Sequence, residues 1–131
     1  MNNVSLTGNL VNDIILRTTD NGVKVTSNTI AVKRNKKESN GEYGTDFINF
    51  VAWRNQAEYL STYAKKGDRL ELVGEWHTRE YEDSKGKRII NELIVDSVGV
   101  HSKQKEDKPE PEKASYKEVM SPFQRNDQLP Y

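Results

Sequence analysis

The sequence predicts an all-β domain, built as a small barrel of short strands and followed by a polar tail. Three observations support this fold class. Several short segments alternate apolar and polar residues, which is typical of strands with one buried face. Only residues 55–66 combine the spacing and the end signals of a helix. All four prolines lie beyond residue 102, where no strand pattern remains.

The first strand is expected over residues 4–11, where the apolar residues fall on one side. Gly8 falls on that side too, which indicates either a bulge or the close approach of another backbone. Extended structure resumes at residues 15–18. The Asn21-Gly22 pair that follows favours a tight hairpin turn, because both residue types accept positive φ angles.

The second strand is expected over residues 23–34, which are rich in Val, Thr and Ile. Its apolar positions change sides between Val25 and Ile30. A bulge reverses the sides to which the following residues point, so we expect one near Ser27 or Asn28.

The third strand is expected over residues 46–53, after a polar, glycine-containing stretch at 33–45 that predicts a long mobile hairpin loop. Side chains alternate across a strand, so this strand has two distinct faces. The wholly apolar face, which suits a core, consists of Ile48, Phe50 and Ala52. The other face consists of Phe47, Asn49, Val51 and Trp53. Two large aromatic rings outside the core favour a surface that stacks on flat groups, while a second core face or a subunit contact would also place them there.

The predicted helix at 55–66 has Asn55 as its N-cap and Gly67 as its expected stop. A long strand follows at residues 68–81. Trp76 falls on the leucine-bearing side of this strand, so we expect it in the core.

A turn at 82–87 leads to a last strand at 88–100, which is apolar on both faces and therefore favours more than one packing surface, such as a subunit contact. Five strands with one helix between the third and fourth predict the OB-fold, a Greek-key barrel whose face and loops bind oligonucleotides. An SH3-like barrel is the nearest alternative. We expect one domain over residues 1–102 and a flexible, disordered C-terminal tail over 103–131.

Composition and charge exclude several classes of function. The formal net charge of +0 argues against a strongly basic protein that coats duplex DNA. The chain has no cysteine, and His77 and His101 lie far apart without other ligands, so we expect no metal site and no cofactor. No nucleophile is paired with a base, which predicts a protein without catalytic residues. We see no membrane span and no signal peptide, so we expect a cytoplasmic protein.

Several short motifs occur in a specific order along the predicted domain. They are Asn3-Val4-Ser5-Leu6-Thr7-Gly8-Asn9-Leu10, Asn28-Thr29-Ile30-Ala31-Val32, Asp46-Phe47-Ile48-Asn49-Phe50-Val51-Ala52-Trp53, Tyr63-Ala64-Lys65-Lys66-Gly67, Thr78-Arg79-Glu80-Tyr81 and Glu92-Leu93-Ile94-Val95-Asp96-Ser97-Val98. In this order and at these spacings, the chain resembles the bacterial and phage single-stranded DNA-binding proteins over about residues 1–100.

The resemblance implies an OB-fold that assembles as a homotetramer and binds single-stranded DNA during replication, recombination and repair. By position, it assigns base stacking to Phe47, Trp53 and Tyr81. Another stacking position of some members falls near Lys36, where this chain carries a charge. The resemblance also places the protein in a bacterial cytoplasm, a nucleoid or a phage-infected host.

Basic residues surround these rings in the predicted topology, and they would contact the phosphates. They are Lys33, Arg34, Lys36, Lys37, Arg54, Arg79, Lys85, Lys87 and Arg88. The tail tip of the resembling family docks replication and recombination proteins. Here that tip corresponds to Asp127, Leu129, Pro130 and Tyr131, with the family's acidic run reduced to one residue. An OB-fold module that docks a protein on its aromatic face is the alternative function, and an enzyme is the third.

Overall fold

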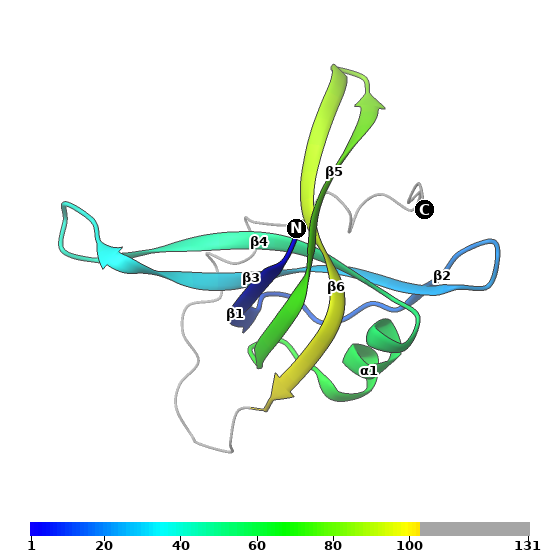
Figure 1. Cartoon of the computed structure of the whole chain (residues 1–131), viewed down its shortest axis with the longest axis horizontal. Coiled ribbons are helices and arrows are strands. Elements are labelled where there is room, and N and C mark those ends of the chain that lie inside the picture. Colours follow the sequence, from blue (N-terminus) through cyan, green and yellow to red (C-terminus); the bar gives the residue numbers. More distant parts are fainter. Residues whose placement is uncertain (103–131) are drawn as a thin grey trace.

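The structure is a computed structural model that describes residues 1–102, which form six strands and one helix (Figure 1). The elements in chain order are β1 Val4–Leu10, β2 Arg17–Thr18, β3 Lys24–Lys37, β4 Tyr43–Trp53, α1 Asn55–Tyr63, β5 Arg69–Asp83 and β6 Gly86–His101. The tail predicted at 103–131 lies outside the described residues. The same holds for the expected docking tip of Asp127, Leu129, Pro130 and Tyr131.

The strands form one sheet that closes into a barrel. Their order is β1-β5-β6-β4-β3-β2, and closure follows because β1 also pairs with β3. All pairs are antiparallel except β4 with β6, where Phe50 lies opposite Leu93. The helix α1 connects β4 to β5 and buries Ala57 and Leu60 against the barrel. The predicted five-stranded barrel with one helix is therefore confirmed, with β2 as a short addition that pairs with β3.

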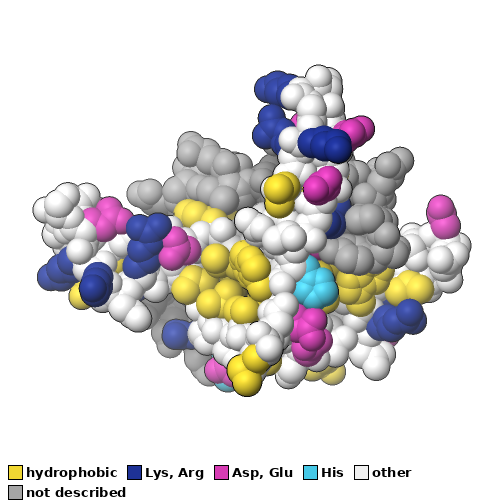
Figure 2. Space-filling view, turned by 45° about the horizontal axis from the view of Figure 1, so that its top comes forward, with side chains coloured by type: hydrophobic (Ala, Val, Ile, Leu, Met, Phe, Trp, Pro, Cys, Tyr) yellow, Lys and Arg dark blue, Asp and Glu magenta, His cyan; other side chains and the backbone are white. Residues whose placement is uncertain are grey.

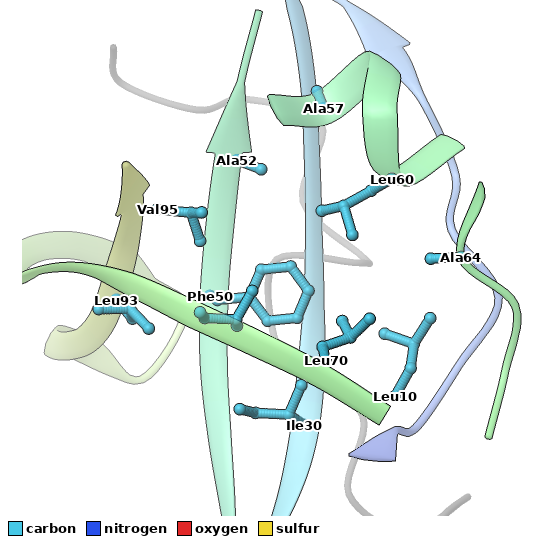
Figure 3. Packing of buried hydrophobic residues seen from close by; sticks show 11 residues of the cluster. Leu10, Ile30, Phe50, Ala52, Ala57, Leu60, Ala64, Leu70, Leu93 and Val95 are labelled. Carbon is cyan, nitrogen blue, oxygen red and sulfur yellow. The ribbon is translucent and has the colours of Figure 1, made fainter. Parts of the chain in front are cut away.

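The core lies between β4, the crossing β5 and β6 strands, and α1. The ring of Phe50 occupies its middle, with Leu70, Leu93 and Ile30 around it and Leu60 reaching in from α1 (Figure 3). All five side chains have no measurable exposure to solvent. The predicted core face of β4 is thus confirmed at Phe50.

Two glycines allow strands to approach closely. A Cβ atom on Gly8 would lie 2.6 Å from the carbonyl oxygen of Ala31, which confirms the close approach predicted for this position. A Cβ atom on Gly74 would collide with the backbone of Ile94. Gly74 lies at the register shift between β5 and β6. Val73 pairs with Ser97 and Gly74 pairs with Val95, so Asp96 is an extra residue on β6 with no residue opposite it. This bulge allows β5 and β6 to bend together around the core.

The segment 33–45, predicted as a mobile loop, is instead mostly a two-stranded arm, so that prediction is wrong. Strand β3 continues to Lys37 and β4 begins at Tyr43, which leaves a turn of residues 38–42. Backbone pairing between two antiparallel strands does not require apolar side chains, and a polar sequence therefore conceals it.

The bulge predicted near Ser27 or Asn28 is also wrong, because the β3–β4 register runs without interruption from Val25 to Lys33. The irregularity lies further along, between Lys33 and Lys37. The first half of β3 is buried on both faces, with Val25 and Asn28 both at most 1% exposed. Apolar residues therefore occur on either side of this strand without any reversal of its pleat.

The helix is shorter than predicted, and Trp76 is not a core residue. The residue before α1 is Arg54, with a positive φ of 56° and no side-chain capping hydrogen bond, so Asn55 is not the cap. Trp76 is 36% exposed. Trp76 lies opposite the fully buried Leu93, so its indole sits at the edge of the core, where β5 and β6 begin to project from the barrel as an arm (Figure 1). The side chain of Asn2 bonds both the backbone N–H and the carbonyl of Trp76.

Candidate nucleic-acid interface

The outer face of β4 is the centre of the candidate site. It carries Phe47, Asn49, Val51 and Trp53, as predicted, because alternate residues point away from the core. Val51 is fully buried and the Asn49 side chain accepts a 3.0 Å hydrogen bond from the Thr29 hydroxyl, so the floor of this face is rigid. Phe47 and Trp53 are both half-buried. Each ring is therefore partly covered by the protein and still presents surface to water.

The same face continues onto the β5–β6 arm, where it carries Tyr81. Val51 of β4 lies opposite Ile94 of β6, so the two side chains share one side of the sheet. Alternate β6 residues keep that side as far as Arg88, which lies opposite Tyr81. The structure therefore places Tyr81, another half-buried ring, on a continuation of the face that bears Phe47 and Trp53.

The same face carries a buried ion pair that the sequence did not reveal. Arg79 and Glu92 fall on the side that bears Tyr81 and Ile94. The Arg79 Nε atom is 3.3 Å from Oε1 of Glu92, and the two side chains are 9% and 0% exposed. Removing one partner of a buried pair leaves an uncompensated charge in the interior, which is strongly destabilising. Arg79 was predicted to contact phosphates, and the structure gives it a carboxylate partner at the base of the β5–β6 arm. The available signal was Glu92 itself, an acid among the apolar residues Ile89, Ile90, Leu93 and Ile94.

The β3–β4 arm separates its charges between its two sides. Asp46 points to the side opposite Phe47, and its Oδ1 accepts two hydrogen bonds from Arg34, of 2.7 and 2.9 Å. Glu38 adds a 3.2 Å contact to Arg34. The hydrogen bond from Arg34 lowers the pKa of the Asp46 carboxyl and raises the pKa of the guanidinium. Arg34 is thus matched with acids on the side away from the aromatic face.

The Phe47 side of the same arm carries Tyr43, which sequence reasoning missed. The Nζ atom of Lys33 lies 4.5 Å from the centroid of the Tyr43 ring, and that of Lys37 lies 5.8 Å from it. Both are cation–π distances. The available signal was parity, since Tyr43 is four residues before Phe47 and even spacing along a strand keeps one side.

The other predicted basic residues are exposed. Figure 2 shows Lys and Arg side chains along the β3–β4 arm and around the end of the β5–β6 arm. Lys85 and Lys87 lie at the turn of the second arm, and Arg88 pairs there with Asp83 at 3.0 Å. Arg54 directly follows Trp53. The positions that the structure leaves open to solvent on these elements are Lys33, Lys36, Lys37, Arg54, Lys85 and Lys87.

The two histidines each face one carboxylate. His77 Nε2 lies 2.9 Å from Glu75, and His101 Nε2 lies 3.2 Å from Glu71. Within residues 1–102, no group of three or more potential ligands could hold a metal ion. No helix in that range is long and apolar enough to cross a membrane.

Comparison with known proteins connects the described domain to one family. Residues 1–101 match the sequence model of the single-strand binding protein family. A single-stranded DNA-binding protein of Streptococcus mutans serotype c is 45% identical over 101 residues, covering 76% of this chain and 62% of that protein. Single-stranded DNA-binding protein 1 of Streptococcus pyogenes serotype M18 is 41% identical over 104 residues, covering 79% and 80%. Single-stranded DNA-binding protein 2 of Listeria monocytogenes serovar 1/2a is 44% identical over 99 residues, covering 75% and 62%. The chain thus spans less than two thirds of two of these relatives.

Proposed function

The chain belongs to the single-strand binding protein family, and on that premise we propose that it binds single-stranded DNA without sequence preference. In this role it protects exposed strands during DNA replication, recombination and repair. The protein acts by binding alone, without catalysis, cofactor or metal.

The observation that carries the proposal is the row of half-buried rings on one continuous outer face. Phe47 and Trp53 lie on β4, and Tyr81 lies where that face extends onto the β5–β6 arm. Every base has a π-face, so stacking on aromatic rings contributes roughly 1–3 kcal/mol per base regardless of sequence. Paired bases in a duplex hide those faces, and the protein therefore prefers single strands.

The phosphate chain is held by the basic residues of the two arms. Lys33 and Lys37 lie on the aromatic side of the first arm, and Lys85 and Lys87 lie at the end of the second. Each neutralised phosphate releases counterions, so affinity falls as salt rises. Arg79 lies within the face itself, where it pairs with Glu92. Arg34 contributes less than its charge suggests, because Asp46 and Glu38 already hold it.

Assembly and partners extend the proposal. We propose a homotetramer in the cytoplasm of a bacterium or of a phage-infected host. The tip formed by Asp127, Leu129, Pro130 and Tyr131 would dock replication or recombination proteins. Family membership supports both statements, and measurement of the mass of the free protein tests the first.

A fluorescence titration with oligo(dT) tests the central proposal. The chain has two tryptophans, of which Trp53 lies on the proposed face and Trp76 on the other side of its arm. We expect strong quenching at low salt that persists in Trp76→Phe, is largely lost in Trp53→Phe and weakens steeply as salt is raised. A duplex of matched length serves as the control ligand. No quenching by oligo(dT) at low salt would refute the proposal, and a face that docks a protein instead would give that result.

Asp46→Asn is expected to increase the affinity for oligo(dT) by about two- to fivefold, with a steeper dependence on salt. The substitution releases Arg34 from its acid partner and removes a negative charge from the arm whose other side bears Lys33 and Lys37. The effect is expected to be modest because both groups of the pair are exposed to solvent and salt. Glu58→Gln on α1 is the matched control and should leave affinity unchanged. A loss of affinity in Asp46→Asn would mean that the ion pair organises the arm for binding.

The difference in oligo(dT) affinity between the wild type and Asp46→Asn has a pH dependence that follows from the lowered pKa of Asp46. A carboxyl whose folded-state pKa is depressed adds stability above its unfolded pKa of about 3.9, and this stability is lost as pH falls through the folded-state pKa. The carboxylate is therefore charged at every pH from about 5 to 8. The ratio of the two affinities should stay constant across that range.

A further inference from the structure

We propose that Tyr43, together with Lys33 and Lys37, forms an additional nucleotide subsite on the β3–β4 arm. One base stacks on the Tyr43 ring, and the two ammonium groups contact the adjoining phosphates. This inference rests on the proposed function and extends the binding path beyond the barrel.

The register of β4 places Tyr43 in line with the two rings already described. Residues 43, 45 and 47 share one side of the strand, and Lys37 lies directly opposite Tyr43. At a rise of about 3.3 Å per residue, Tyr43 lies ~13 Å from Phe47, and Phe47 lies ~20 Å from Trp53. One extended strand of DNA that follows β4 would therefore meet the three rings in succession.

The Tyr43 side chain is available to a ligand. It is 44% exposed. Its neighbours in the described structure are the ammonium groups of Lys33 and Lys37, at 4.5 and 5.8 Å from its centroid. Cation–π contacts at exposed sites are weak, so each ammonium can exchange the ring for a phosphate when a base stacks on the tyrosine.

Two features of the arm concentrate positive charge on the Tyr43 side. Lys33 pairs with Thr45 and Lys37 pairs with Tyr43, with a register shift between the two pairs. Because of this shift, the ammonium groups of both lysines lie over the Tyr43 ring. On the other side of the arm, Arg34 holds the carboxylates of Asp46 and Glu38. These two acids are thereby kept from pairing with the lysines.

Tyr43→Leu tests the subsite in the full chain, with Trp53 quenching by oligo(dT) as the readout. Loss of one stacked base should weaken affinity about tenfold without changing the dependence of log K on log salt. Tyr43→Phe keeps the ring and should bind within about twofold of the wild type. The double variant Lys33→Gln and Lys37→Gln should lower the salt slope by about 1.4, as expected for two phosphate contacts on a single strand. Tyr63→Leu, which removes an exposed tyrosine from α1, should match the wild type.

A direct reporter gives an independent readout. In a protein carrying Trp53→Phe and Trp76→Phe, the change Tyr43→Trp places a single tryptophan on the arm. Oligo(dT) should quench it if a base stacks there. Absence of quenching in this variant, while the wild type is quenched through Trp53, overturns the subsite and leaves the proposed function standing.

Two further outcomes would also overturn the subsite. If Tyr43→Leu binds as tightly as Tyr63→Leu, then no base stacks on Tyr43. If Tyr43→Leu lowers the salt slope along with the affinity, then the ring serves only to support the two lysines. Failure of the wild type itself to bind oligo(dT) is a different result, because it refutes the proposed function as well.

Discussion

Replacing both Phe47 and Trp53 with alanine is expected to weaken the binding of single-stranded DNA by at least about 30-fold while the protein stays folded. Each ring lost removes roughly 1–3 kcal/mol of stacking, and every 1.4 kcal/mol is a factor of about ten in affinity. Both side chains are only half-buried and point away from the core, so truncation leaves no large cavity. The fold should therefore survive in the doubly substituted protein, as circular dichroism can verify.

Because this variant lacks its fluorescent reporter, the measurement is the anisotropy of a fluorescein-labelled oligo(dT). The matched control replaces Tyr59 and Tyr63, an aromatic pair on α1 whose ring centroids are 4.8 Å apart. That control removes as many rings from a surface outside the proposed face. Equal affinities of the two double variants would contradict our assignment of the binding face.

Phe50→Ala is expected to destabilise the protein by about 3–5 kcal/mol, which is a large part of the ~5–15 kcal/mol that stabilises a typical domain. Phe50 is 0% exposed and its ring lies in the middle of the core, among Leu70, Leu93 and Ile30 (Figure 3). Truncation removes apolar contacts and leaves a cavity that the surrounding strands cannot fill.

Urea denaturation of the free protein measures this effect. Phe50→Leu should cost less than half as much, since a smaller cavity remains. The fraction of Phe50→Ala that is folded should bind oligo(dT) nearly as well as the wild type, because the outer face is unchanged. A loss of stability below about 1 kcal/mol would show that this side chain is not central to the core.

These two experiments separate the faces of one strand. Phe47 and Phe50 are the same residue type, three positions apart, and they point to opposite sides of β4. Substitution of the first should reduce binding and spare stability, whereas substitution of the second should do the reverse. The alternation of side chains along the strand is sufficient to predict this contrast.

Local patterns predicted most of the barrel. The period of two in β4 assigned Phe50 inward and Phe47 and Trp53 outward, and the structure agrees. Gly8 was expected to allow a close approach, and it lies against Ala31. Such features depend on the pleat and on the size of one residue, which the sequence states directly.

Local patterns gave wrong predictions for the exposure of Trp76 and for the structure of residues 33–45, because both depend on how two strands pair and where they leave the barrel. Trp76 follows the leucine side of β5, yet it is exposed because β5 and β6 project beyond the barrel. The polar segment 33–45 pairs as an arm because backbone hydrogen bonds, which no side-chain pattern reports, join its two halves.

The sequence by itself determined the succession of strands along the chain, the presence of one helix and the two faces of β4, because these follow from residue type and local spacing. Only the tertiary structure decided that Glu92 would bury its charge against Arg79 and that two lysines would converge on Tyr43. The first pairing joins two strands across a hairpin, and the second requires an irregular register between β3 and β4. Both depend on the alignment of one strand against another, which is a property of the assembled sheet rather than of any single segment.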